Sequence, residues 1–318
     1  MPQAHSTQTE RVLLADLSPS DKPWDIHGAE RDSVQKLYAK AGHRPYAQRM
    51  LTCTQLLDFE LKFQETGELR PRLKSTHCCR LRHCPVCQWR RSLRHRALFF
   101  QVMPKILEAF PTHRFLFLTL TILNCPLNDL RDQLKLMTAA WAKMSRERCS
   151  WWPAVGWVRS TEVTRGKDGS SHPHFHAILM VPSGYFKNAY ITQAQWTDHW
   201  KRAMKLDYTP QVNIKTVKGL PGETDKDGLV RAVCETLKYS TKFKHLTHDA
   251  EWLIGLTEQL HKTRAIATGG LFKDFLADLE KDEINEDLIN VGEEDNGEAL
   301  AGFTAGWNYN IKHYEIRD

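Results

Sequence analysis

The stretch Gly156–Val181 reads GWVRSTEVTRGKDGSSHPHFHAILMV, and it decides the predicted fold. Its first part is rich in β-branched and aromatic residues, RGKDGSS is typical of a turn, and an apolar run follows three alternate histidines. The stretch therefore predicts a β-hairpin with strands over 156–164 and 174–181.

Segments on both sides of this hairpin complete an α+β pattern. Further strands are predicted over 114–122 and 212–217, and helices over 90–110, 127–148, 192–204 and 229–242. The order β-α-β-β-α-β-α indicates a split βαβ arrangement of the ferredoxin or RRM type. Its helices are expected on one face of a central antiparallel sheet.

Size and composition limit the class of protein. With 318 residues, of which 41% are hydrophobic, the chain can bury a core without disulfides. The N-terminal 30 residues contain no apolar segment typical of a signal peptide, and the run FLFLTLTIL is too short to span a bilayer. We therefore expect a cytoplasmic protein without a membrane partner.

The net charge of +6 is unevenly distributed. Residues 70–96 hold nine Lys or Arg and no acid, whereas 278–298 hold ten acids and one Lys. A basic block attracts polyanions, and this one coincides with most of the cysteines, which favours nucleic acid over a merely solvated surface. The acidic stretch is expected to be a solvated, partly mobile region.

The cysteines cluster in THCCRLRHCPVCQWRR. In a cytoplasmic chain this spacing favours a structural zinc site over a disulfide, a redox pair or buried thiols. Zinc requires four ligands, so Cys79, Cys84 and Cys87 need one more. Cys53 is the favoured fourth ligand, and the alternatives are His77, Cys78 and His83.

The alternating histidines share one face of their strand. The hairpin loop is centred near Asp168, so Glu162 is expected across from His174 or His176. Two imidazoles and a carboxylate suit Mn²⁺ or Mg²⁺ at a phosphate. Packing histidines and a histidine-triad nucleotide hydrolase are the alternatives that the motif leaves open.

A second motif is RAVCETLKYSTKFK. On the predicted helix, Glu235 and Tyr239 lie four residues apart and therefore on one face, with Lys238 and Lys242 beside the tyrosine. An amphipathic surface helix with a partly exposed tyrosine would give the same pattern.

The order of these motifs along the chain resembles that of the rolling-circle plasmid replication initiators of the HUH endonuclease superfamily, in the Rep_1 group. The resemblance covers Tyr46–Lys273 and rests on CRLRHCPVC, FLTLT, HPHFHAILMV and the E-x-x-x-Y-S-x-K helix. It implies a metal-dependent endonuclease that nicks one DNA strand through a 5′-phosphotyrosine and leaves a 3′-OH primer.

The resemblance also implies site residues. The family's metal ligands correspond to His174, His176 and Glu162, its nucleophile to Tyr239 and its second catalytic acid to Glu235, with His172 as an accessory residue. DNA contacts are expected from Arg80, Arg82, Arg90, Arg91, Lys238 and Lys242.

The implied partners are the plasmid double-strand origin, single-stranded or hairpin DNA at the nick, and host helicase and polymerase; a homodimer is left open. Four regions are expected: an N-terminal, partly flexible arm (1–45), a basic zinc segment (46–110), an HUH nuclease domain (111–245) and a helical, acidic C-terminal region (246–318). A single-tyrosine HUH transposase and a non-enzymatic zinc DNA-binding regulator are the remaining alternatives.

Overall fold

The chain forms two compact units. The residues described by the computed structural model are 11–63, 67–146, 149–238, 241–282 and 301–317. One unit is built from Met1–Arg90 and Asp287–Asp318, and the other from Arg91–Glu286. Helix α4 (Pro85–Ala109) starts in the first unit and continues into the second. Within the described residues, no helix combines the length and apolar character needed to cross a membrane.

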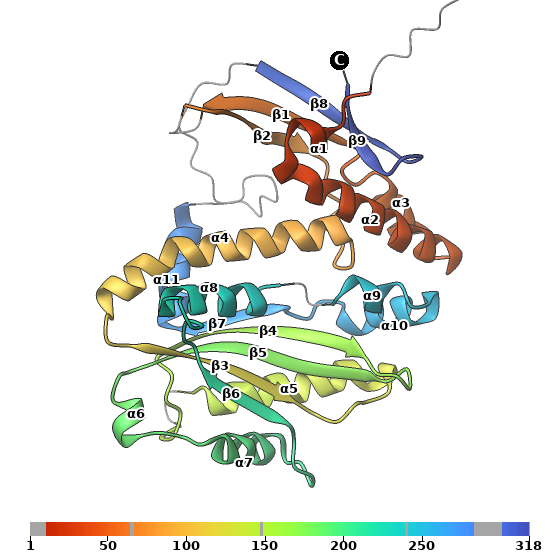
Figure 1. The fold of residues 1–318 in the computed structure, drawn as a ribbon. Coiled ribbons are helices and arrows are strands. Elements are labelled where there is room, and N and C mark those ends of the chain that lie inside the picture. The colour runs from red at the N-terminus through yellow and green to blue at the C-terminus, as the bar shows by residue number, and fades with distance from the viewer. Residues whose placement is uncertain (1–10, 64–66, 147–148, 239–240, 283–300, 318) are drawn as a thin grey trace, which may run out of the picture. The chain divides into compact units, whose positions relative to one another are not determined.

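The second unit is built around a five-stranded antiparallel sheet in the order β6-β3-β5-β4-β7 (Figure 1). Its strands are β3 (Arg114–Thr121), β4 (Gly156–Arg165), β5 (Ser171–Val181), β6 (Val212–Thr216) and β7 (Ile266–Gly270). The predicted α+β class with a central antiparallel sheet is therefore confirmed. The edge strand β7 was not predicted, and it pairs with β4.

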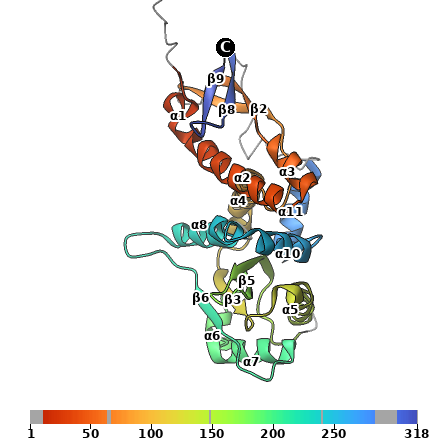
Figure 2. The ribbon, with the colours of Figure 1, turned by 90° about the vertical axis from the view of Figure 1, so that its right-hand side faces the viewer.

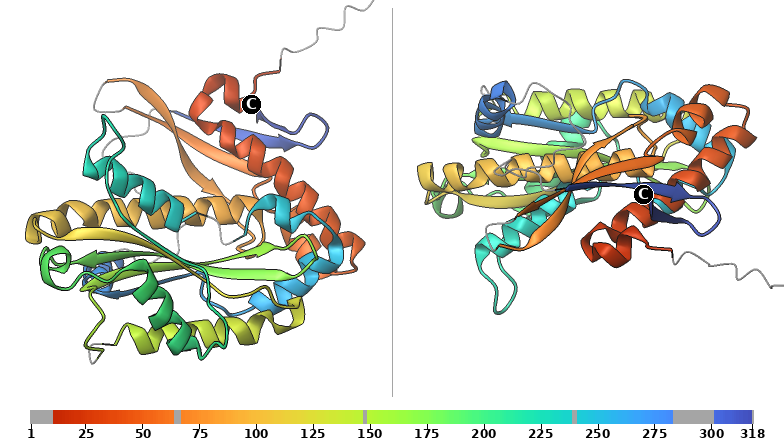
Figure 3. Two further views of the ribbon diagram at one scale, coloured as in Figure 1. Left: turned by 60° about the horizontal axis from the view of Figure 1, so that its bottom comes forward. Right: turned by 90° about the horizontal axis from the view of Figure 1, so that it is seen from above.

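Helices cover both faces of this sheet. The helices of the second unit are the continuing part of α4, η2 (Leu127–Asp129), α5 (Leu130–Met144), α6 (Tyr185–Asn188), α7 (Gln193–Met204), α8 (Asp225–Thr236), α9 (Phe243–Leu246), α10 (Ala250–Leu260) and α11 (Leu271–Asp282). Figure 1 shows α8 on one side of β4 and β5, with α5 and α7 on the other, and Figure 3 shows the β4–β5 hairpin running alongside α5.

The expectation of helices on one face only is wrong because β5 is apolar on both faces. Phe175 packs against Trp141 of α5 and Trp200 of α7. Ile178 and Met180 instead join the core that α4, α8 and α11 form on the other side. A continuous apolar run is typical of a strand that is covered twice.

Helix α8 differs from the predicted helix over 229–242. It begins at Asp225, where Thr224 forms a capping box with Asp227, and it ends at Thr236. The Ser92 hydroxyl of α4 donates to the Leu237 carbonyl at 2.7 Å, so a distant side chain satisfies this group at the helix end.

The first unit contains a four-stranded antiparallel sheet in the order β2-β1-β8-β9 (Figure 2). Its elements are α1 (Leu14–Leu17), η1 (Pro19–Asp21), α2 (Lys22–Lys40), α3 (Arg44–Leu51), β1 (Leu56–Phe63), β2 (Leu69–Thr76), β8 (Ala301–Asn308) and β9 (His313–Arg317).

This arrangement differs from the predicted division at both ends of the chain. The expected arm contains the 19-residue α2, in which Trp24, Val34 and Tyr38 are buried. A Cβ atom on Gly28 would lie 2.7 Å from the Trp307 ring, so α2 requires glycine where it meets β8. The C-terminal region supplies strands to the sheet of the first unit, and most of the acidic stretch expected over 278–298 lies outside the described residues.

Candidate functional site

The β4–β5 hairpin places a carboxylate between two imidazoles. Its register pairs Glu162 with His174 and Ser160 with His176, as the loop position predicted. Glu162 Oε2 lies 3.3 Å from Nε2 of His174 and 3.3 Å from Nε2 of His176. We call Glu162, His174 and His176 the histidine–carboxylate cluster; their donor atoms all lie within 4.8 Å of one another.

These distances are long for hydrogen bonds and would also suit donor atoms that share one cation. An N–H···O bond is typically about 2.9 Å long, which is shorter than both contacts. Donor atoms about 2.1 Å from one ion are separated by roughly 3.0 Å in an octahedron and 3.4 Å in a tetrahedron. The observed 3.3 Å lies within that range.

A backbone carbonyl lies next to the second ring nitrogen of His174. Its Nδ1 lies 3.3 Å from the carbonyl oxygen of His172, which can only accept a hydrogen. A proton on Nδ1 would leave the lone pair on Nε2, the atom directed at Glu162, available to a metal ion. A histidine ligand to a metal is commonly oriented in this way by its second nitrogen.

The Glu162 side chain is buried and charged. Burial by itself would raise the pKa of Glu162, but hydrogen bonds with His174 and His176 and the charge of Lys238 hold that pKa well below its usual range. The carboxylate is therefore ionised at neutral pH. A buried carboxylate of this kind needs a compensating positive charge.

Three neighbours of the histidines were not identified from the sequence. The Thr119 hydroxyl lies 3.1 Å from His176 Nδ1, and the Phe117 ring stacks on His176. Asn124 Oδ1 lies 2.8 Å from Nδ1 of the half-buried His172. Side chains alternate along FLFLTLT, so Phe117 and Thr119 share one face of β3. Antiparallel pairing of β3 with β5 puts Thr119 opposite His176, and this pairing is the signal that could have identified both residues.

Two lysines lie beside the carboxylate. Lys242 Nζ is 3.8 Å from Glu162 Oε1, and Lys238 contributes to the lowered pKa of Glu162. Lys238 also forms an ion pair with the exposed Glu235. Helix α8 ends at Thr236, three positions before the expected tyrosine nucleophile. Tyr239 lies outside the described residues.

The first unit brings four buried cysteines together. Cys53 follows α3, Cys79 follows β2, and Cys84 and Cys87 lie at the start of α4. This group, the four-cysteine cluster, includes Cys53 and none of the three alternatives considered for the fourth position. The N-terminus of α4 favours negative charge on the sulfurs of Cys84 and Cys87.

The sulfur spacing matches a tetrahedral metal site. The Sγ–Sγ distances Cys53–Cys84, Cys53–Cys87 and Cys79–Cys87 are each 3.7 Å. A tetrahedron with Zn–S bonds of ~2.3 Å has edges of roughly 3.8 Å. Burial raises the pKa of Cys84, whereas hydrogen bonds from Cys53 and other thiols lower that of Cys87.

The predicted DNA-contacting arginines occupy different environments. Arg80 is exposed, and Arg82 and Arg91 are half-buried. Arg90 is only 8% exposed, with its guanidinium 5.1 Å from the Trp24 ring centroid and 5.4 Å from that of Trp89. This packing argues against a phosphate contact by Arg90.

The chain is similar to known replication proteins over most of its length. Residues 70–315 match the family model of Rep_1, described as a replication protein. Protein rep of Lentilactobacillus hilgardii is 35% identical over 317 residues, covering 96% of this chain and 99% of that protein. Protein rep of Streptococcus pneumoniae serotype 2 is 33% identical, covering 98% of each chain. No solved structure matches.

The chain therefore belongs to the Rep_1 family of replication proteins. Protein rep of Bacillus amyloliquefaciens, 31% identical over 98% of this chain and all of that protein, agrees with this assignment. The predicted resemblance is confirmed at this level. Membership of a replication family decides against a histidine-triad nucleotide hydrolase.

Proposed function

We propose that this protein initiates rolling-circle replication of a plasmid by nicking one strand of its origin through a covalent tyrosine intermediate. The observation that carries the proposal is the histidine–carboxylate cluster with Lys238 and Lys242 next to it. These two lysines flank Tyr239 in the sequence. This proximity in the sequence supports Tyr239 as the nucleophile that acts at the cluster, and the sheet of the second unit would serve as the HUH palm.

The donor set suits Mn²⁺ or Mg²⁺ held by His174, His176 and Glu162. Such an ion would polarise the scissile phosphate and stabilise charge that develops on its oxygens. The chain supplies the positioning: the His172 carbonyl orients His174, and Thr119 orients His176. His172, bonded to Asn124, is the proposed accessory residue at the rim of the cluster.

Described residues on both sides of position 239 in the sequence are buried. Leu237 is 2% exposed and belongs to the core beneath α8, and Thr241 is 1% exposed. In the proposed reaction the Tyr239 oxygen loses its proton and bonds to phosphorus, the P–O3′ bond breaks, and the leaving 3′ oxygen takes up a proton to become the 3′-OH primer. Lys238 and Lys242 are cations that could stabilise the phenolate and the DNA backbone.

DNA recognition is proposed to use both units. Arg80, Arg82 and Arg91 are the proposed phosphate contacts, and zinc in the four-cysteine cluster would hold Arg80 and Arg82 in place. The proposed ligands are the double-strand origin and single-stranded or hairpin DNA at the nick, with host helicase and polymerase acting afterwards. The relatives are named replication proteins, which favours initiation over transposition.

Replacing Glu162 with Gln tests the metal-dependent part of the proposal. The amide keeps the side-chain size but removes the negative charge, so we expect Mn²⁺ affinity to fall by at least about 100-fold, since even neighbours of metal ligands are worth 10–100-fold. Nicking of supercoiled plasmid should fall with it. The measurements are Mn²⁺ titration calorimetry and a nicking assay.

The matched control is Glu251→Gln, an exposed glutamate on α10. We expect this control to leave Mn²⁺ binding and nicking unchanged. Wild-type Mn²⁺ affinity and nicking in Glu162→Gln would contradict the proposed site. DNA binding without any nicking by the wild-type protein would support the non-enzymatic regulator instead.

Replacing Glu235 with Ala tests the proposed role of this carboxylate in termination. We propose that Glu235 activates water for the second cleavage, so the first nick should be spared and release of the finished circle should fall by about 100-fold or more. Glu235 reaches the site region through Lys238, with which it pairs. The assay follows the first nick and circle release separately, with Glu251→Gln as control; equal loss of both steps would assign Glu235 a structural role.

A further inference from the structure

A cavity of about 850 Å³ lies in the second unit, on the sheet face opposite the histidine–carboxylate cluster. Alternation along β4 puts Glu162 on one face and Trp157, Arg159 and Thr161 on the other, and these three residues line the cavity together with α5 and residues 261–264 after α10. The volume is typical of a small-molecule site, about 300–1,000 Å³.

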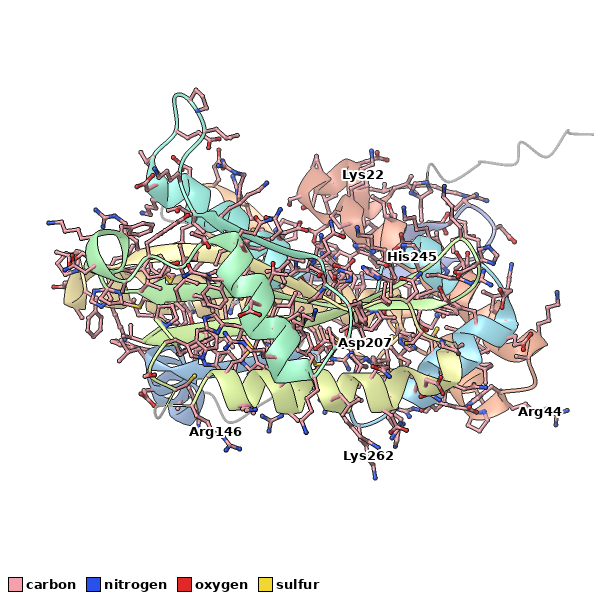
Figure 4. All side chains as sticks on the ribbon, turned by 90° about the horizontal axis from the view of Figure 1, so that it is seen from below. Lys22, Arg44, Arg146, Asp207, His245 and Lys262 are labelled. Carbon is pink, nitrogen blue, oxygen red and sulfur yellow. The ribbon has the colours of Figure 1, made fainter. Side chains whose placement is uncertain are left out.

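The lining of the cavity is strongly basic. It contains no Asp or Glu, and its Lys and Arg residues are Arg131, Lys135, Arg146, Arg159, Lys262 and Arg264. Figure 4 shows Arg146 and Lys262 along α5. Lys135 forms an exposed ion pair with Asp132, outside the lining. A concave surface with one sign of charge concentrates ligands of the opposite sign.

Arg159 is the most informative residue of this lining. It is 4% exposed, and its Nε and Nη1 have no hydrogen-bond partner among the described residues. Burial lowers its pKa to about 10, so the guanidinium is still charged at neutral pH. Its Cζ lies 3.9 Å from the Phe175 ring centroid and 5.4 Å from that of Trp141. Ring contacts offset only part of the cost of burying an unpaired charge.

An aromatic wall lies next to this charge. Trp141 and Trp157 both line the cavity, and their rings meet edge to face with centroids 5.1 Å apart. The indole N–H of Trp141 is buried without an acceptor among the described residues. Indole rings stack on nucleobases, and guanidinium groups bind phosphate.

We infer that this cavity binds a nucleotide, with its phosphate on Arg159 and the surrounding cations and its base against Trp141 and Trp157. The nucleotide is either free or part of a single DNA strand, since both present the same phosphate and base. This site is distinct from the histidine–carboxylate cluster and does not depend on nicking.

The test is calorimetry on the full-length protein with deoxyadenosine 5′-diphosphate, the tetranucleotide d(A)₄ and inorganic phosphate as separate probes. Arg159→Met should weaken nucleotide binding at least about tenfold, as expected for a lost charged hydrogen bond. It should not lower the melting temperature, because the variant removes an unpaired buried charge. Lys143→Ala, an exposed residue of α5 outside the lining, is the matched control and should bind like wild type.

A second variant keeps the inference testable if Arg159→Met does not fold. Arg264→Ala changes an exposed lining residue, and it should weaken the same probe about fivefold or more. Binding of the diphosphate assigns a free nucleotide, and binding of d(A)₄ alone assigns a DNA strand. Wild-type affinity in both variants, equal affinity for inorganic phosphate, or no binding of either nucleotide probe would overturn the inference.

Discussion

Replacing Tyr239 with Phe should abolish plasmid nicking and the covalent protein–DNA adduct. Removing one hydroxyl eliminates the only proposed nucleophile, and loss of a nucleophile typically costs at least about 10⁴-fold in rate. Because the hydroxyl is not part of the proposed metal site, Mn²⁺ affinity and origin binding should remain at wild-type values. The measurements are a supercoiled-plasmid nicking assay and denaturing gels of labelled oligonucleotide.

Tyr190→Phe is the matched control for this substitution. Tyr190 is 58% exposed and lies near α7, so its loss tests the same chemical change at a surface position. The control should nick at the wild-type rate. Full nicking by Tyr239→Phe would remove Tyr239 from the mechanism, whereas loss of nicking in both variants would show that the assay reports general damage.

Replacing Cys84 with Ser should remove zinc and unfold the first unit. Structural zinc contributes about 10–16 kcal/mol to small zinc domains, and the whole net stability of a domain is about 5–15 kcal/mol. The four-cysteine cluster joins the ends of α3 and β2 to the start of α4, so its loss disconnects these elements. Metal analysis should give one zinc per wild-type chain and none in the variant.

Cys149→Ser provides the control, because Cys149 is a half-buried cysteine outside the four-cysteine cluster. It should retain zinc and the wild-type hydrogen-exchange protection of residues 22–40. Chelation of the wild-type protein should reproduce the Cys84→Ser result. Full zinc content and protection in Cys84→Ser would contradict the metal assignment.

Local patterns predicted the hairpin well. The position of the RGKDGSS turn placed Glu162 across from His174 or His176, and the structure pairs it with His174, because strand pairing next to a short loop follows from loop length. Because zinc requires four ligands, Cys53 was the favoured partner for Cys79, Cys84 and Cys87. In the structure Cys53 lies together with these three cysteines. The helix predicted over 192–204 is present as α7, at whose start Thr192 forms a capping box.

Features that depend on distant parts of the chain could not be predicted. Residues 301–306 pair with β1, more than 230 positions earlier, and no local signal indicates such a pairing. The end of α8 depends on Ser92, and the burial of Arg90 depends on Trp24. The basic character of residues 70–96 therefore did not distinguish exposed arginines from one that packs on aromatic rings.

The central claim is that Tyr239 becomes linked to DNA at a site organised by Glu162, His174 and His176. Its most direct test is mass spectrometry of the peptide that carries DNA after incubation with a single-stranded origin oligonucleotide and Mn²⁺. We predict that the peptide containing Tyr239 carries a 5′-phosphodiester and that the adduct is absent without Mn²⁺. An adduct on another residue, or none under these conditions, would contradict the claim.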